Sequence, residues 1–90
     1  MADVQLTCVV KLSPDSPHED ITHMGTSRQV WSRERVIAWI EARTDTFHTI
    51  GPNGKRAEVA VVREPGKPPY LRSRADGEWN DNLLALPQCR

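Results

Sequence analysis

The chain has 90 residues, with 12 Lys and Arg against 12 Asp and Glu, so its formal net charge is zero. Apolar residues make up 38% and charged residues 27%, and no apolar run approaches the roughly 20 residues that cross a bilayer. This composition indicates a single domain, residues 1–90, with one small core. It excludes a transmembrane protein, a collagen-like fibre, a disulfide-dense scaffold and a strongly basic nucleic-acid binder.

The two ends of the chain bear on its location and its redox state. The first ten residues lack the basic and long apolar regions of a signal peptide, so the cytoplasm is the expected location. Cys8 and Cys89 are too few for a disulfide framework or a thiolate zinc site, and we expect two reduced thiols. A disulfide that joins the chain ends is the alternative, and it needs an oxidising compartment.

Alternating apolar residues near the N-terminus predict one half-buried strand, because successive side chains of a strand point to opposite faces. The inward residues of this strand are Val4, Leu6, Cys8, Val10 and Leu12. The pattern places the Cys8 thiol on the buried face, and the two prolines of residues 13–17 end the strand. A short second strand is expected at residues 21–24, before Gly25.

Residues 32–43 carry the strongest helix signal. Ser32 suits the N-cap, because its hydroxyl can accept a hydrogen bond from a first-turn amide. Trp31 and Val36 sit at the positions of a hydrophobic staple. The apolar stripe of this helix is roughly 160° wide and consists of Val36, Ile37, Trp39 and Ile40. Because a helix of this length is marginal alone in water, we expect its apolar face to pack on a sheet.

A hairpin is expected where Gly51-Pro52-Asn53-Gly54 separates two β-like segments, residues 46–50 and 55–63. Asn and Gly both tolerate the positive φ of a tight turn, so the turn falls at Asn53-Gly54.

Two registers of this hairpin compete. A two-residue turn pairs Pro52 with Lys55, whereas a three-residue turn pairs Gly51 with Lys55. We favour the second, because it gathers one face from Phe47, Thr49, Ala57, Val59 and Val61. It also places His48 opposite Glu58 on the outer face.

Residues 70–74 are expected to form a short last strand after a turn at residues 64–69. Asp81 is then expected to cap a single helical turn, which Pro87 ends. The leucines of this turn are too apolar for an exposed tail and should close one end of the core; they are Leu83, Leu84 and Leu86. The order of the elements predicts an α+β domain, with a small antiparallel sheet of about four to five strands, one long helix (residues 32–43) on one face and a short C-terminal helical turn.

Several segments together resemble a known family. They are His18-Glu19-Asp20-Ile21-Thr22-His23 followed by Gly25, then Val36-Ile37-Ala38-Trp39-Ile40, Tyr70-Leu71-Arg72-Ser73, Asp76-Gly77, and Asp81-Asn82-Leu83-Leu84-Ala85-Leu86-Pro87-Gln88-Cys89. From His18 to Cys89 the chain resembles a family of small, mostly bacterial proteins catalogued as domain of unknown function 3892. The family's usual Gly-Gly is here Gly25-Thr26. The resemblance implies no activity, cofactor or binding residues.

The sequence offers few residues for catalysis or metal binding. His18, Glu19, Asp20 and His23 have side chains that bind zinc elsewhere, but this segment lacks a clear third and fourth ligand. We expect a polar loop and no metal site. There is no phosphate-binding Gly-rich loop and no nucleophile elbow, and the Cys8 thiol is expected to be buried. We therefore expect no catalytic residues, no cofactor and no enzymatic activity.

Two features indicate binding surfaces. Tyr70, Arg72 and Arg74 alternate, so they share one face of the last strand, where Arg suits phosphate and Tyr can stack on a base. An ordinary solvated strand face is the alternative. Trp79 has no periodic reason to be buried, and an exposed Trp is a common interface anchor. A Trp79 that folds back over the core is the alternative.

These observations favour a small non-catalytic cytoplasmic binding module that acts through a protein surface. The alternative is weak nucleic-acid or polyanion binding through the Tyr70, Arg72 and Arg74 face. A third and weaker hypothesis is a metal-dependent enzyme that uses His18 and His23 with Asp20. An unknown protein partner is favoured, nucleic acid is expected to bind weakly, and no membrane partner is expected.

Overall fold

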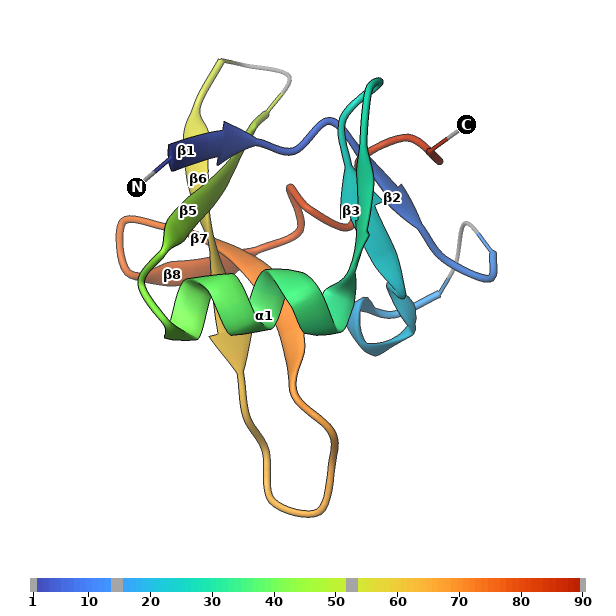
Figure 1. Ribbon diagram of the computed structural model, residues 1–90, viewed down its shortest axis with the longest axis vertical. Coiled ribbons are helices and arrows are strands. Elements are labelled where there is room, and N and C mark those ends of the chain that lie inside the picture. Colours follow the sequence, from blue (N-terminus) through green and yellow to red (C-terminus); the bar gives the residue numbers. More distant parts are fainter. Residues whose placement is uncertain (1, 14–15, 52–53, 90) are drawn as a thin grey trace.

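Figure 1 shows the computed structural model, which describes residues 2–13, 16–51 and 54–89. Two sheets and one helix enclose a common core. The first sheet contains, in spatial order, β1 (Ala2–Gln5), β5 (Asp45–Ile50), β6 (Arg56–Val62), β7 (Tyr70–Ala75) and β8 (Glu78–Asn80). The second contains β2 (Cys8–Val10), β3 (His23–Gly25) and β4 (Val30–Ser32). A 3₁₀ turn, η1 (His18–Asp20), and the helix α1 (Arg33–Glu41) complete the fold.

The α+β class is confirmed, and two details of the expected sheet are wrong. The described residues form two sheets where one was expected. The larger sheet is also mixed, because β1 runs parallel to β5 while the other neighbouring strands pair antiparallel.

The N-terminal segment is not one strand, which corrects the expectation drawn from its alternating pattern. The chain changes sheets between Leu6, whose N–H donates to His48 O at 2.8 Å, and Thr7, whose N–H donates to Gly25 O at 2.8 Å. Figure 1 shows this crossing between β1 and β2. Leu6 and Cys8 are buried as expected, whereas Leu12 is 92% exposed, because β2 ends at Val10.

The short second strand begins two residues later and ends one residue later than expected, and its partner β4 was not expected at all. Ile21 precedes β3 and is buried in the core, with a relative exposure of 1%. β3 pairs with β2 on one side and with β4 on the other.

The helix is confirmed and ends two residues before its expected end. Ser32 caps it, since its Oγ accepts a hydrogen bond from Arg35 N–H at 3.2 Å. Val36 and Ile37 are buried, and α1 lies across both sheets in Figure 1. The remaining stripe residues, Trp39 and Ile40, are half-buried at the rim of the core.

The favoured register of the hairpin is confirmed. Gly51 N–H donates to Lys55 O at 2.8 Å, and His48 lies opposite Glu58. Gly54 has a φ of +80°, as a tight turn requires, while the other turn residues, Pro52 and Asn53, lie outside the described part of the chain.

The last strand is confirmed, and a further strand, β8, follows it. The expected short C-terminal helical turn is present, with Ala85 N–H donating to Asp81 O and Leu86 N–H to Leu83 O. The side chain of Asp81 does not cap this turn; the amide N–H of Asn82 donates to the Asn80 side chain at 3.0 Å.

The leucines of this turn close the core as expected. Leu83 is fully buried, and Leu84 and Leu86 pack against it at the edge. The buried cluster consists of Leu6, Val9, Ile21, Met24, Val36, Ile37, Phe47, Val59, Leu71 and Leu83. Within the described residues, no helix combines the length and hydropathy that a bilayer span requires.

The expectation of two reduced thiols is wrong for this structure. Cys8 and Cys89 form a disulfide across a sequence separation of 81 residues, with their Cα atoms 4.8 Å apart. The chain ends meet because β2 pairs with the C-terminus through a parallel bridge between Val9 and Gln88.

Candidate functional site

The structure places the expected surface residues on one face of β7. Leu71 and Ser73 point into the core, so Tyr70, Arg72 and Arg74 occupy the opposite face, as their alternation predicts. Their environments differ: Tyr70 is buried, Arg72 is half-buried and Arg74 is exposed.

Tyr70 does not lie on the surface. It is 6% exposed, and its hydroxyl donates a hydrogen bond to the Glu64 carboxylate. That hydrogen bond, with burial as a second cause, raises the pKa of Tyr70. The ring is therefore not available to stack on a nucleic-acid base.

Trp79 lies on the surface beside the two arginines. It is 42% exposed and stands directly opposite Arg74 in the β7–β8 ladder. The guanidinium carbon of Arg74 lies 5.4 Å from the centroid of the Trp79 ring, and that of Arg72 lies 5.7 Å away. Both distances are within the range of cation–π attraction. We call Arg72, Arg74 and Trp79 the Trp79 surface.

Arg72 also faces a small polar cluster. Its Nη2 lies 3.6 Å from Asp81 Oδ1, and His18 Nε2 lies 3.5 Å from the same oxygen without hydrogen-bond geometry. Burial, followed by the charge of Arg72, lowers the pKa of His18 below its ordinary value of 6.5. His18 is therefore held in its neutral form against the sheet, and Asp81 offsets the charge of Arg72.

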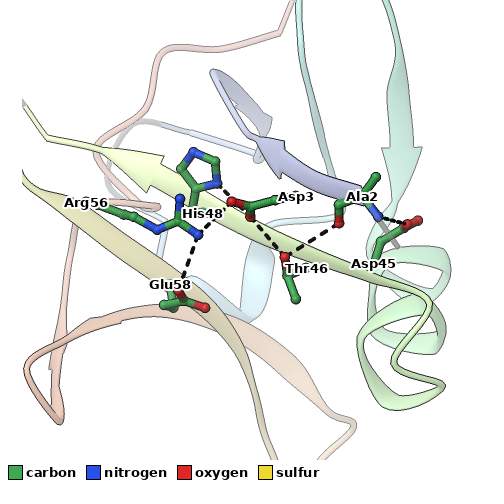
Figure 2. Close-up of polar contacts among 7 residues, drawn as sticks. All are labelled: Ala2, Asp3, Asp45, Thr46, His48, Arg56 and Glu58. Carbon is green, nitrogen blue, oxygen red and sulfur yellow. Dashed lines mark hydrogen bonds and ion pairs between the residues drawn. The ribbon is translucent and has the colours of Figure 1, made fainter.

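A polar row continues from the Trp79 surface across the same sheet. The ladder pairs Arg74 with Glu58 on β6 and Glu58 with His48 on β5. Figure 2 shows the far end of this row, where Asp3 of β1 joins it. The Asp3 carboxylate accepts hydrogen bonds from Thr46 Oγ1 at 2.9 Å and from His48 Nδ1 at 3.1 Å.

Arg56 completes this network and pairs with both of its carboxylates. Its Nη2 lies 2.8 Å from Asp3 Oδ2 and 3.3 Å from Glu58 Oε1. The Arg56 guanidinium, with the Thr46 hydroxyl as second cause, holds the pKa of Asp3 below its usual range. Arg56 and Arg72 thus have acidic neighbours. In residues 2–13, 16–51 and 54–89, Arg74 forms no ion pair.

A hollow of 390 Å³ opens beside the Trp79 surface. Its lining mixes both charges and comprises Lys55, Arg56, Glu58, Arg74, Ala75, Asp76 and Gly77.

The two histidines among the candidate metal ligands His18, Glu19, Asp20 and His23 occupy different environments. His18 is buried beside Asp81, whereas His23 is exposed and its Nδ1 lies 3.0 Å from Thr22 Oγ1. Among the residues that the structure describes, no group of three or more His, Cys, Asp or Glu side chains is placed to hold a metal ion.

Sequence reasoning missed Asp3, and it expected Asp81 as a helix cap and not as a partner of Arg72. His48 opposite Glu58 was the one signal for this row, since the favoured register put both on the outer face. Asp3 reaches them only because β1 pairs in parallel with β5 from 43 residues away, and no local pattern carries that pairing.

The fold and this surface define a small α+β protein with two sheets around one core and an arginine-flanked tryptophan on its exterior. The family model for a protein of unknown function, DUF3892, matches residues 5–87, and the chain belongs to this family. The resemblance noted in the sequence is confirmed, and the match also covers residues 5–17, which lay outside it. Comparison with curated proteins and with solved structures found no match.

Proposed function

We propose that this protein is a small non-catalytic binding module that engages a protein partner through the Trp79 surface. The observation that carries the proposal is the half-exposed Trp79 ring with two guanidinium groups against it. Trp and Arg are the residue types most enriched among the energetic centres of protein interfaces. The Arg72 and Arg74 contacts also restrict the ring before binding, which lowers the entropy cost of association.

The charges of this face favour a protein partner over a polyanion. Arg56 and Arg72 have acidic neighbours, so a phosphate backbone would meet Asp3, Glu58 and Asp81 together with the arginines. Protein interfaces commonly surround an aromatic centre with a polar rim.

Nucleic-acid binding stays the alternative, with Arg74 as the observation that favours it. With few cations free to meet phosphates, binding to single strands should show a log–log salt slope of about −1 to −2. The Tyr70 ring would not contribute, because it is buried.

We further propose a bacterial cytoplasm as the setting, following the family resemblance. Disulfides in that compartment are usually transient, catalytic or redox-sensing. Rapid alkylation of thiols in intact cells tests the location, since a cytoplasmic chain should carry reduced Cys8 and Cys89 for part of its lifetime.

Affinity capture from the native host, with and without nuclease, tests the proposed function. The bait proteins are the wild type, Trp79→Ala and Leu12→Ala, the last removing an exposed side chain that lies outside the Trp79 surface. We expect the wild type and Leu12→Ala to retain the same partner proteins and Trp79→Ala to lose them. Nuclease treatment should not release these proteins. Nucleic acid retained in place of proteins would favour the alternative.

A further inference from the structure

We propose that Cys8–Cys89 is a redox site at which a dithiol reductant unlatches the C-terminal end of the chain from β2. The proposal is independent of the Trp79 surface. It concerns residues 81–89, which we call the C-terminal strap.

The first half of the strap is anchored in the core. Leu83 is fully buried, and its N–H donates a hydrogen bond to Ser73 Oγ at 3.0 Å. Lys11 Nζ donates to Leu84 O at 2.8 Å and ties the strap to the end of β2. These contacts do not involve either cysteine, so they persist when the disulfide is broken.

The second half of the strap is held by much less. Val9 N–H donates to Pro87 O at 3.0 Å, and Cys89 N–H donates to Val9 O at 2.9 Å. Besides a 3.5 Å contact from Gln88 Nε2 to Lys11 O, the disulfide is the remaining tie among the described residues. Figure 1 shows this end of the chain alongside β2. It covers the β2 edge that faces away from β3, and an uncovered edge of this kind accepts an added strand.

The disulfide is accessible to a small reductant. A cavity of 290 Å³ lies against it, lined by Thr7, Cys8, Thr26, Ser27, Gln88 and Cys89. Cys8 is 8% exposed, whereas Cys89 is half-buried, so we assign the first attack to Cys89.

The exchange proceeds in two displacements. One thiolate of the dithiol attacks Cys89 Sγ, which forms a mixed disulfide and breaks the bond to Cys8 Sγ; Cys8 leaves as a thiolate and takes up a proton. The second thiolate of the dithiol then attacks its own sulfur in the mixed disulfide and releases Cys89, which is protonated in turn. The protein gains two electrons and two protons, and the dithiol becomes a disulfide.

The site also accommodates the reduced form. Cys8 Sγ lies 3.9 Å from Thr26 O. In the disulfide this sulfur has no proton to donate, whereas the Cys8 thiol can donate a weak hydrogen bond to that carbonyl. Reduction therefore leaves Cys8 with a partner and leaves residues 87–89 with two backbone hydrogen bonds and a weak amide contact.

Hydrogen exchange of backbone amides tests the proposal on the full chain. The protein is measured oxidised, reduced with dithiothreitol, and as the Cys8→Ser/Cys89→Ser variant. The readout is the exchange rate of the Val9 and Cys89 amides divided by that of amides in the β6–β7 ladder, which corrects for any change in global stability. We expect this ratio to rise at least about tenfold on reduction and in the variant. Gln88→Ala, which keeps both cysteines, should match the wild type when oxidised.

Three results would overturn the proposal. The first is a disulfide that dithiothreitol leaves intact in the folded protein, as shown by alkylation. The second is an unchanged ratio, which would make the disulfide a global staple. The third is loss of the β6–β7 protection together with the circular dichroism of the fold on reduction.

Discussion

Gly25 is the residue whose replacement the fold tolerates least among the glycines with described surroundings. A Cβ on Gly25 would lie 2.1 Å from Gln29 O and 2.7 Å from Val30 Cα, both of which are backbone atoms. The β3–β4 hairpin closes at this point, since Thr26 N–H donates to Gln29 O. Any side chain here must push the two strands apart.

We predict that Gly25→Ala lowers the free energy of unfolding by about 3 kcal/mol or more, the upper range for overpacking. Gly54→Ala is the matched control, because its surroundings are open and only its positive φ is strained, at roughly 1 kcal/mol. Urea denaturation measures both. A loss for Gly25→Ala no larger than that for Gly54→Ala would contradict the close approach.

His18 should make stability depend on pH. Burial and Arg72 lower its pKa in the folded state, opposed by Asp81 and Glu19. The unfolded chain therefore binds a proton near pH 6.5 before the folded chain does. The contribution of neutral His18 is complete above that pH and is lost as pH falls through the window below it.

We predict that His18→Gln flattens the decline in unfolding free energy between about pH 7 and pH 5. His23→Gln is the matched control, because it makes the same chemical change at an exposed site. Denaturation at several pH values measures the slope, and equal slopes for His18→Gln and the wild type would show that His18 does not titrate in this window.

At the scale of elements, the sequence predicted what local patterns encode. Ser32 and the apolar stripe predicted α1, and the inward residues of the β5–β6 hairpin predicted its register. Alternation over residues 4–12 could not reveal that the chain changes sheets, because the two halves differ in their distant partners. The second half also breaks the alternation, since Val9 is fully buried and Leu12 is 92% exposed. The β7 alternation likewise placed Tyr70 on the outer face but could not show that Tyr70 is buried and donates a hydrogen bond to Glu64.

The end of α1 offers a second test at this scale. Arg43 has a φ of +58°, and the N–H groups of Arg43 and Thr44 donate to Ile40 O and Trp39 O. This arrangement normally carries glycine after the last helical residue. We predict that Arg43→Gly raises stability by about 1 kcal/mol, whereas Arg43→Ala gives no gain. Thermal unfolding measures both, and an Ala variant as stable as the Gly variant would contradict the backbone geometry.

The buried face of α1 is centred nearer its N-terminal end than the stripe predicts. Ile37 is 6% exposed, while Ile40 is half-buried. We predict that Ile37→Ala costs about 2–5 kcal/mol and that Ile40→Ala, the same chemical change, costs clearly less. A larger loss for Ile40→Ala in urea denaturation would mean that the helix packs with another face inward.

At the scale of the molecule, two sheets share one core, and segments far apart in the sequence pair at two places. At the first, β1 pairs with β5 and the Asp3 network links the two strands. At the second, β2 pairs with the C-terminal strap. The charged side chains of the outer sheet face are paired, because Asp3, Glu58 and Asp81 each lie beside an arginine. Acidic and basic side chains are thus mixed on this face of the sheet. The exposed aromatic ring of Trp79 is what sets the Trp79 surface apart from the rest of that face.

The affinity of a purified partner for variants of the Trp79 surface tests whether Trp79 is the centre of a protein interface. The protein that the wild type captures most strongly is titrated by calorimetry against wild type, Trp79→Ala and Leu12→Ala. We predict that Trp79→Ala weakens binding by about 30-fold or more, as expected for an energetic centre of an interface, and that Leu12→Ala binds as the wild type does. Affinities for wild type and Trp79→Ala that agree within about twofold would contradict it.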